Sequence, residues 1–160
     1  RAASDAGPGR LEIPPGAMGA LDAIAAARED EIRAIVYRQA KSPAMWMTTP
    51  ARDLADLGAI DRRRVFMAGT AREVAARFPD NLNTSVGVAL AGLGLDRTRV
   101  ELVADPALLA TCHELDLDGG PGSYSVRVGG RPVGPGGDPV DYSTFGLLRI
   151  LRRRTARIAT

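Results

Sequence analysis

The chain has 160 residues, of which 45% are hydrophobic and 25% are charged, a composition typical of one globular domain with a single core. Its 21 basic and 19 acidic residues leave a net charge of only +2, and aromatic residues make up 4%. Nucleic-acid binding usually needs a clustered basic surface with aromatic residues for stacking, so we expect no nucleic-acid partner. The longest uncharged run, residues 81–95, is too short to cross a bilayer, so no membrane partner is expected either.

The single cysteine, Cys112, excludes an internal disulfide and is typical of a reducing compartment, so a cytoplasmic location is expected. The chain begins at Arg1 rather than at a methionine, and no apolar run of a signal peptide follows. Residues 1–10 are therefore interpreted as the end of a preceding segment. We predict one domain over residues 1–160, with residues 142–157 as its C-terminal helix.

The first half of the chain predicts two strands with a helix between them. Residues 10–14 are expected to form a short strand that ends at the two prolines, and residues 16–30 have the apolar spacing of a helix. Residues 31–40 alternate as a strand, which ends before Pro43. The alternation divides this strand into two faces: Ile32, Ala34 and Val36 on one, and Arg33, Ile35 and Tyr37 on the other.

The least regular part is residues 42–64, where the apolar triplet 45–47 predicts a loop packed on the body or a contact with another chain. A strand running into a helix follows, and Thr70 with Glu73 predicts a capping box at the start of that helix. A second helix is expected to begin near Asn81 or Asn83. Its apolar residues at core spacing are Leu82, Val86, Ala89, Leu90 and Leu93.

The last third predicts a strand over residues 99–105, a turn of helix over 106–110 and a hairpin over 112–130 that reverses between Gly119 and Gly122. A final helix ends the chain. These elements together predict an α+β fold with a mixed, largely antiparallel sheet, covered on one face by helices, and with a C-terminal helix.

The only histidine of the chain, His113, directly follows the only cysteine in the predicted hairpin. Successive side chains of a strand point to opposite faces, so Cys112 and His113 do not form a catalytic pair. His113 shares its face with Leu115 and Leu117, which indicates that it points inward. One histidine and one cysteine are too few ligands for a zinc site, so no metal is expected.

Two interpretations of an inward His113 remain open on the pattern alone. It is either a neutral core histidine with backbone partners or a general acid/base beside a cleft, because imidazole titrates near neutral pH. Asn83 is either a helix cap or a ligand contact. Ala17 follows Gly16 where a predicted strand meets the N-terminus of a predicted helix, a place where a ligand could approach the backbone. The chain contains no GxGxxG fingerprint and no phosphate-binding loop.

Four segments occur together in an order and spacing found in one family. They are LEIPPGAMGALDAI, VFMAGTAREVAARFPDNLN, TRVELVADP and HELDLDG. Through them nearly the whole chain resembles the C-terminal catalytic domain of L-aspartate dehydrogenases. The sequence departs from that family at Thr111, where asparagine is common, at Pro15, where serine is usual, and in DYSTFGLL at the final helix. These departures bear on substrate preference more than on reaction class.

The resemblance implies an enzyme of amino-acid metabolism and NAD biosynthesis that oxidises L-aspartate through iminoaspartate to oxaloacetate and ammonia with NAD or NADP. It implies His113 as the catalytic base, Ala17 and Asn83 as cofactor-binding residues near the nicotinamide, and Lys41, the only lysine, as a substrate contact. It also implies a preceding N-terminal Rossmann domain, absent from this chain, that holds most of the cofactor. We expect a homodimer.

A second hypothesis assigns the same fold to a non-catalytic module that dimerises or binds a dicarboxylate. The missing nucleotide fingerprint favours that module for the chain taken alone, whereas the trio of Ala17, Asn83 and His113 favours the enzyme.

Overall fold

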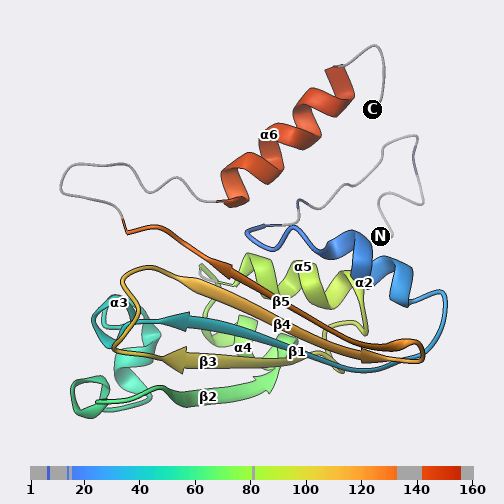
Figure 1. Cartoon of the computed structure of the whole chain (residues 1–160). Helices are drawn as coiled ribbons and strands as arrows, with labels where there is room; N and C mark the ends of the chain where they lie inside the picture. The colour runs from blue at the N-terminus through green and yellow to red at the C-terminus, as the bar shows by residue number, and fades with distance from the viewer. Residues whose placement is uncertain (1–6, 8–13, 15, 81, 133–141, 156–160) are drawn as a thin grey trace.

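The computed structural model describes residues 7, 14, 16–80, 82–132 and 142–155. Its centre is a five-stranded sheet in the order β2-β3-β1-β4-β5 (Figure 1). The strands are β1 (Ile32–Lys41), β2 (Arg64–Thr70), β3 (Arg99–Ala104), β4 (Cys112–Gly119) and β5 (Gly122–Gly129). Only the β1–β3 pair is parallel and the other three pairs are antiparallel, so the predicted mixed, largely antiparallel sheet is confirmed.

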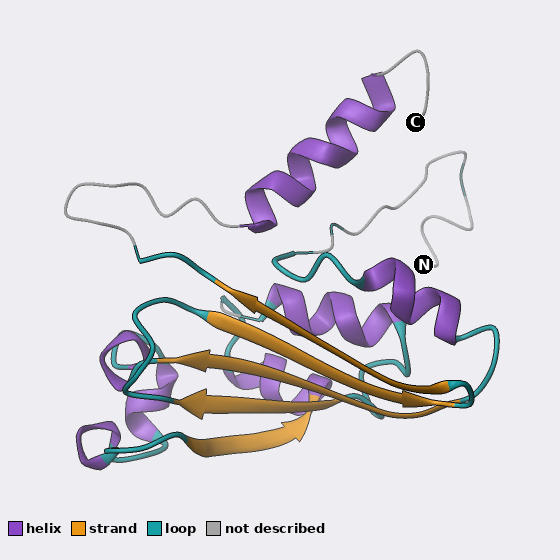
Figure 2. Cartoon of the chain, in the orientation of Figure 1, coloured by secondary structure: helices purple, strands orange, loops and turns teal. Residues whose placement is uncertain are grey.

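Helices cover one face of this sheet (Figure 2). The helices are α2 (Leu21–Ala27), α3 (Pro43–Trp46), α4 (Ala71–Arg77), α5 (Asn83–Ala91) and α6 (Tyr142–Thr155), with short 3-10 turns over Pro50–Asp53 and Leu57–Ala59. Side chains of α2, α4 and α5, among them Ile24, Val74 and Val88, join those of β1, β3 and β4 in one apolar core. The predicted cover on one face and the C-terminal helix are confirmed.

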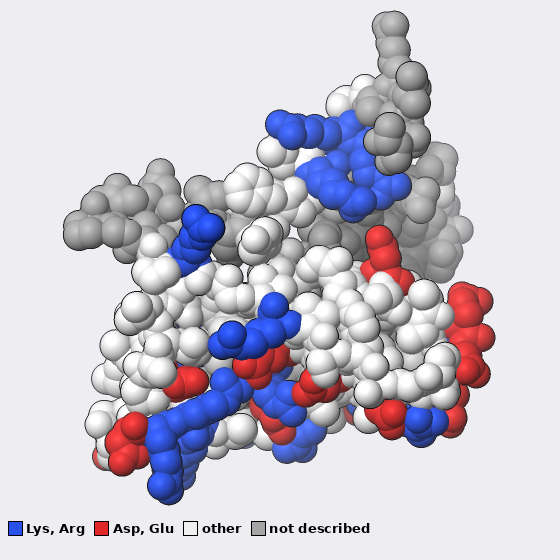
Figure 3. Space-filling model, viewed as in Figure 1, with Lys and Arg blue, Asp and Glu red and all other residues white. Residues whose placement is uncertain are grey.

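The opposite face of the sheet is charged rather than apolar. Arg38 of β1 lies between Glu101 and Asp116, and its Nε is 2.8 Å from the Glu101 carboxylate. Arg63 pairs with Glu114 at 2.7 Å. Figure 3 shows such basic and acidic side chains interspersed over the strands. One face of the sheet is therefore apolar and the other charged, so the side chains of the hairpin strands alternate between the two faces, as the sequence predicts.

Strand β1 departs from the predicted division of faces at its start. A bulge lies between Ile32 and Ala34, so Ile32 joins Ile35 and Tyr37 in the core, whereas Ala34 is exposed. The prediction that Ile32 shares a face with Ala34 and Val36 is therefore wrong. A bulge inserts one residue into the strand and reverses the alternation beyond it, and here Arg33 is the residue that turns outward to pair with Asp118 at 3.0 Å.

Other local predictions have mixed outcomes. The capping box is confirmed, because Thr70 accepts from the backbone of Glu73 and Glu73 accepts from that of Thr70. The turn of helix over residues 106–110 is wrong, since the Asp105 carboxylate accepts from the Ala107 backbone and forms a turn instead. The predicted strand at residues 10–14 falls almost entirely outside the described residues.

The predicted core side of helix α5 is confirmed at Leu82 and Ala89, which are buried, and is wrong at Leu90. Leu90 is 42% exposed, whereas the small or polar residues Thr84, Ser85 and Gly87 are buried. The helix packs against both α2 and α4, and small side chains permit that close approach. The triplet 45–47 packs on the body: Trp46 is fully buried and donates through Nε1 to the Val103 carbonyl at 2.8 Å, while Met47 is exposed.

Candidate functional site

His113 lies near the start of β4 on the helix-covered face, where its side chain is 8% exposed. In the sheet it is paired with Gln39 of β1 and with Val128 of β5. Cys112 points to the other face and packs with Ala40 and Val103 in a small separate cluster. The two neighbours are thus held on opposite sides of the sheet.

The hydroxyl of Tyr37 lies 2.6 Å from Nδ1 of the His113 ring, within hydrogen-bond distance. Tyr37 is fully buried, and this burial raises its pKa far above the ordinary value. The hydroxyl therefore stays protonated, so that it either accepts a hydrogen bond from Nδ1–H or donates one to Nδ1, according to the tautomer of the imidazole.

Thr84, in the first turn of α5, continues the contact inward. Its hydroxyl forms a hydrogen bond with that of Tyr37, which lowers the pKa of Tyr37 against the larger effect of burial. The same oxygen accepts from the Ala17 backbone at 3.4 Å and lies 3.5 Å from Oδ1 of Asn83. Thr84 thereby connects three segments that are far apart in the sequence.

The tautomer of His113 sets the direction of the hydrogens at its contact with Tyr37. When Nδ1 carries the hydrogen and donates it to the Tyr37 hydroxyl, the lone pair of the neutral imidazole lies on Nε2, the form that a general base requires. The Thr84 hydroxyl has one hydrogen, which it donates either to Tyr37 or to Oδ1 of Asn83.

The loop before α2 approaches α5 closely at Gly16. Its φ is +60°, and a Cβ built there would lie 2.7 Å from the Thr84 hydroxyl oxygen. Only glycine combines that backbone conformation with so short an approach. Gly16 therefore allows the Ala17 backbone N–H to reach Thr84.

The structure thus brings Ala17, Asn83 and His113 together, through two residues that the sequence pattern did not single out, Tyr37 and Thr84. Asn83 is the exposed first residue of α5, and its Oδ1 accepts from the Thr84 backbone at 2.8 Å. Asn81 lies outside the described residues. A buried tyrosine usually has a partner for its hydroxyl, which is the one sequence signal that could have pointed to Tyr37.

Lys41, at the end of β1, shares the helix-covered face with Tyr37 and Gln39. Its ammonium group lies 4.8 Å from the centre of the Trp46 ring. Burial lowers the pKa of Lys41, and no carboxylate in the described part of the chain forms an ion pair with it. Lys41 is therefore a partly buried cation whose charge the described carboxylates do not balance.

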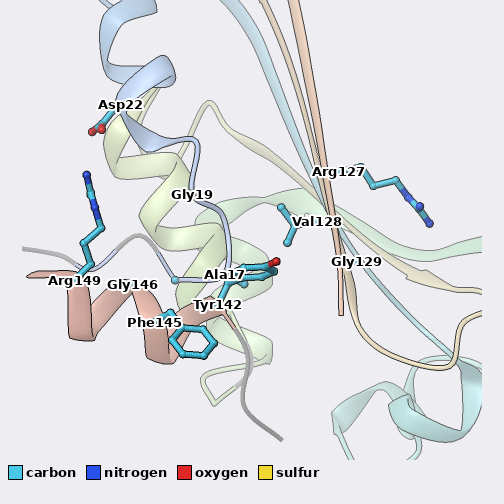
Figure 4. A pocket seen from close by; sticks show the side chains of 11 residues that line it. Ala17, Gly19, Asp22, Arg127, Val128, Gly129, Tyr142, Phe145, Gly146 and Arg149 are labelled. Atoms are coloured by element: carbon cyan, nitrogen blue, oxygen red, sulfur yellow. The ribbon is translucent and has the colours of Figure 1, made fainter. Parts of the chain in front are cut away.

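A pocket of about 570 Å³ lies between the loop before α2, strand β5 and helix α6 (Figure 4). Ala17, Val128, Tyr142 and Phe145 line its apolar part. Two residues that line the pocket contact the residues around His113. The Ala17 backbone is hydrogen-bonded to Thr84, and Val128 is paired with His113 in the sheet. In Figure 4 the Arg127 side chain points away from Tyr142 and Phe145, consistent with its contact to Glu114 on the other face.

No group of three or more His, Cys, Asp or Glu side chains in the described ranges has the arrangement of a metal site. None of the helices described here combines the length and apolar character that a membrane span needs.

Comparison with known proteins gives matches over nearly all of the chain. Residues 22–151 match the family model described as the C-terminal part of aspartate dehydrogenase. L-aspartate dehydrogenase from Pseudomonas aeruginosa is 36% identical over 150 residues, which are 94% of this chain and 56% of that protein. L-aspartate dehydrogenase from Serratia proteamaculans is 40% identical over 125 residues, which are 78% of this chain and 47% of that protein.

A solved structure, that of aspartate dehydrogenase from Thermotoga maritima, matches with a TM-score of 0.73 and 22% sequence identity. The match covers 98% of this chain and 58% of that one, and it supports the fold. The chain spans about half to three-fifths of the length of the curated relatives that it matches.

Proposed function

The chain belongs to the family of aspartate dehydrogenase C-terminal domains, and from this membership we propose that it is the catalytic portion of an NAD(P)-dependent L-aspartate dehydrogenase. The reaction oxidises the amine carbon of L-aspartate to give iminoaspartate, and water then hydrolyses the imine to oxaloacetate and ammonia. The single observation that carries the proposal is the hydrogen-bonded chain from His113 through Tyr37 and Thr84 to Asn83 and Ala17.

His113 is the proposed general base. In the tautomer in which Nδ1–H donates to Tyr37, the lone pair on Nε2 can take a proton from the substrate amine or from the water that attacks the imine. Tyr37 is a positioning residue in this scheme, because it acts on the substrate only through the imidazole.

The residues beside Ala17 fit the nicotinamide end of NAD or NADP. The pocket wall there is apolar and partly aromatic, with Val128, Tyr142 and Phe145, and Gly16 brings bare backbone to its edge. Such a wall suits the flat nicotinamide ring. The exposed side-chain amide of Asn83 is available for a hydrogen bond to the cofactor. When bound, the nicotinamide supplies the acceptor for a hydride from the substrate carbon. The adenine half requires another domain, since this sequence has no dinucleotide fingerprint.

Lys41 is the proposed cation for a substrate carboxylate. A dicarboxylate in a closed site needs cationic or N–H partners. Lys41 is partly buried on the same sheet face as His113, and no described carboxylate neutralises it.

Helix α6 supports the proposal of an N-terminal Rossmann domain as partner. Its apolar side chains are largely exposed: Tyr142, Phe145, Leu147 and Leu151. An apolar helix stripe of this size is usually covered by another part of the protein, and the relatives have over two-fifths of their length outside the match. The full-length protein is further proposed to be a homodimer in the cytoplasm, with a role in amino-acid metabolism and NAD biosynthesis.

The alternative is a module of the same fold that dimerises or binds a dicarboxylate without redox chemistry. The lack of a nucleotide fingerprint in these 160 residues is the observation that favours it.

Reduction of the cofactor separates the two. We expect the full-length protein that contains this chain to form NADH or NADPH when L-aspartate is added, measured by the absorbance of the reduced nicotinamide. The 160-residue chain alone is expected to show no turnover, because it lacks a site for the adenine half. D-aspartate is the control substrate. A full-length protein that reduces neither cofactor in the presence of L-aspartate would support the non-catalytic module instead.

A further inference from the structure

The helix-covered face of β1 carries a short polar row where the rest of that face is apolar. Tyr37, Gln39 and Lys41 occupy alternate positions of the strand and so project to the same side. In the register of the sheet Gln39 is directly opposite His113, and directly opposite side chains have their Cβ atoms about 5 Å apart. Gln39 is thus placed between the proposed base and the proposed substrate cation.

The side chain of Gln39 is buried but not fully bonded. Gln39 is 5% exposed, and its Oε1 has no hydrogen-bond partner within the described residues. Buried side-chain oxygens nearly always have a donor, and one without a partner destabilises the fold. Only one other described side-chain atom, Oγ1 of Thr98, is in the same situation. An oxygen left open beside His113 therefore indicates a donor that arrives with a ligand.

The chemistry of the neighbouring groups limits what that donor is. Lys41 provides positive charge for a carboxylate, whereas Oε1 is a neutral acceptor and suits an N–H group. An amino acid with a second carboxylate offers both kinds of group. A neutral amide oxygen also suits an amine that must lose protons and become an imine, because a carboxylate in the same place would favour the protonated ammonium form.

We propose that Oε1 of Gln39 binds the amino group of the substrate, an α-amino dicarboxylate, and so selects amino acids over dicarboxylates that lack the amine. This inference rests on the proposed function, because it takes the site around His113 as the substrate site. It adds a specificity-determining residue to that site.

The test compares an amine-bearing ligand with one that lacks the amine. In the full-length protein, Gln39→Met keeps the length of the side chain and removes the amide. The KM for L-aspartate is expected to rise about tenfold to a hundredfold, the usual loss for a hydrogen bond to a charged group. The inhibition constant of succinate, a dicarboxylate without an amine, is expected to change by less than about twofold, because it makes no bond to Oε1.

Thr98→Val is the matched control, because it also removes a buried oxygen without a hydrogen-bond partner. Thr98 directly precedes β3, whereas Gln39 pairs with Leu102 farther along that strand, so the two oxygens lie at different places in the sheet. Thr98→Val should leave both constants unchanged. The thermal unfolding midpoint is measured for every variant, and Gln39→Leu replaces Gln39→Met if the latter lacks a cooperative transition.

Two results would overturn the inference while the proposed function stands. One is an unchanged KM for L-aspartate in folded Gln39→Met. The other is an equal rise of the KM for L-aspartate and of the inhibition constant for succinate, which would show that Gln39 shapes the site without binding the amino group. If the wild-type full-length protein does not oxidise L-aspartate, the proposed function itself fails, before any variant is compared.

Discussion

The orientation of His113 follows from the sequence of its own strand, but the residues that contact it do not. The period-two alternation of a strand predicts that His113 points inward and that Cys112 points to the other face, and the structure has this arrangement. Tyr37 and Thr84 could not be predicted in the same way. Their contacts depend on the register of β1 against β4 and on where α5 lies over the sheet, and both are set by tertiary packing.

Tyr37→Phe tests the positioning role at this scale. The change removes the oxygen that is 2.6 Å from Nδ1 of His113, so the tautomer of the imidazole is no longer fixed. In the full-length protein, kcat for L-aspartate oxidation is expected to fall about tenfold to a hundredfold, the usual loss for a hydrogen bond to a group that becomes charged, with little change in KM, because Tyr37 does not touch the substrate.

Tyr124→Phe is the control for that variant, since Tyr124 is partly exposed on β5. A role for Tyr37 in packing alone would lower the thermal midpoint and leave kcat as in the wild type, and that outcome would contradict the positioning role.

The elements differ in how far they follow from local sequence. The capping box of α4 and the hairpin of β4 and β5 carry signals within a few residues, and the structure has both. The bulge in β1 carries none. In α5 the apolar spacing identifies Leu82 and Ala89 as buried but fails at Leu90, which is exposed. The helix packs against α2 and α4, and small residues such as Ser85 and Gly87 are buried there.

The capping box gives a stability prediction. Thr70→Ala removes the side-chain acceptor for the Glu73 backbone N–H, and the free energy of unfolding at neutral pH is expected to fall by about 1 kcal/mol. Urea denaturation followed by circular dichroism measures the change. An unchanged midpoint would mean that α4 does not depend on its cap.

Glu73 adds a pH dependence of known sign to the same element. The hydrogen bond from the Thr70 backbone lowers the pKa of the Glu73 carboxyl below its ordinary 4.5. A lowered carboxyl pKa stabilises the folded state at pH values above the ordinary pKa, and this contribution is lost as the pH falls through the folded-state pKa. Glu73→Ala should therefore be less stable than the wild type near neutral pH and approach it in acid. Glu29→Gln, at an exposed position, is the control for the removal of a surface carboxylate.

At the scale of the whole molecule, the alternation of predicted strands and helices is sufficient for the fold class but not for the strand order. The order β2-β3-β1-β4-β5 places the second strand of the described chain at an edge and the first at the centre, which depends on contacts between distant segments. The pocket beneath α6 could not be predicted either. It forms only when residues near the start of the chain meet β5 and the final helix.

The most direct test of the account is the effect of His113→Ala on aspartate-dependent reduction of NAD or NADP by the full-length protein. Loss of a general base is expected to lower kcat/KM by about two to four orders of magnitude, with the thermal midpoint close to that of the wild type. Cys112→Ala, at the neighbouring residue on the other face, should keep near wild-type activity. A folded His113→Ala protein that oxidises L-aspartate at the wild-type rate would contradict the assignment of His113 as the base.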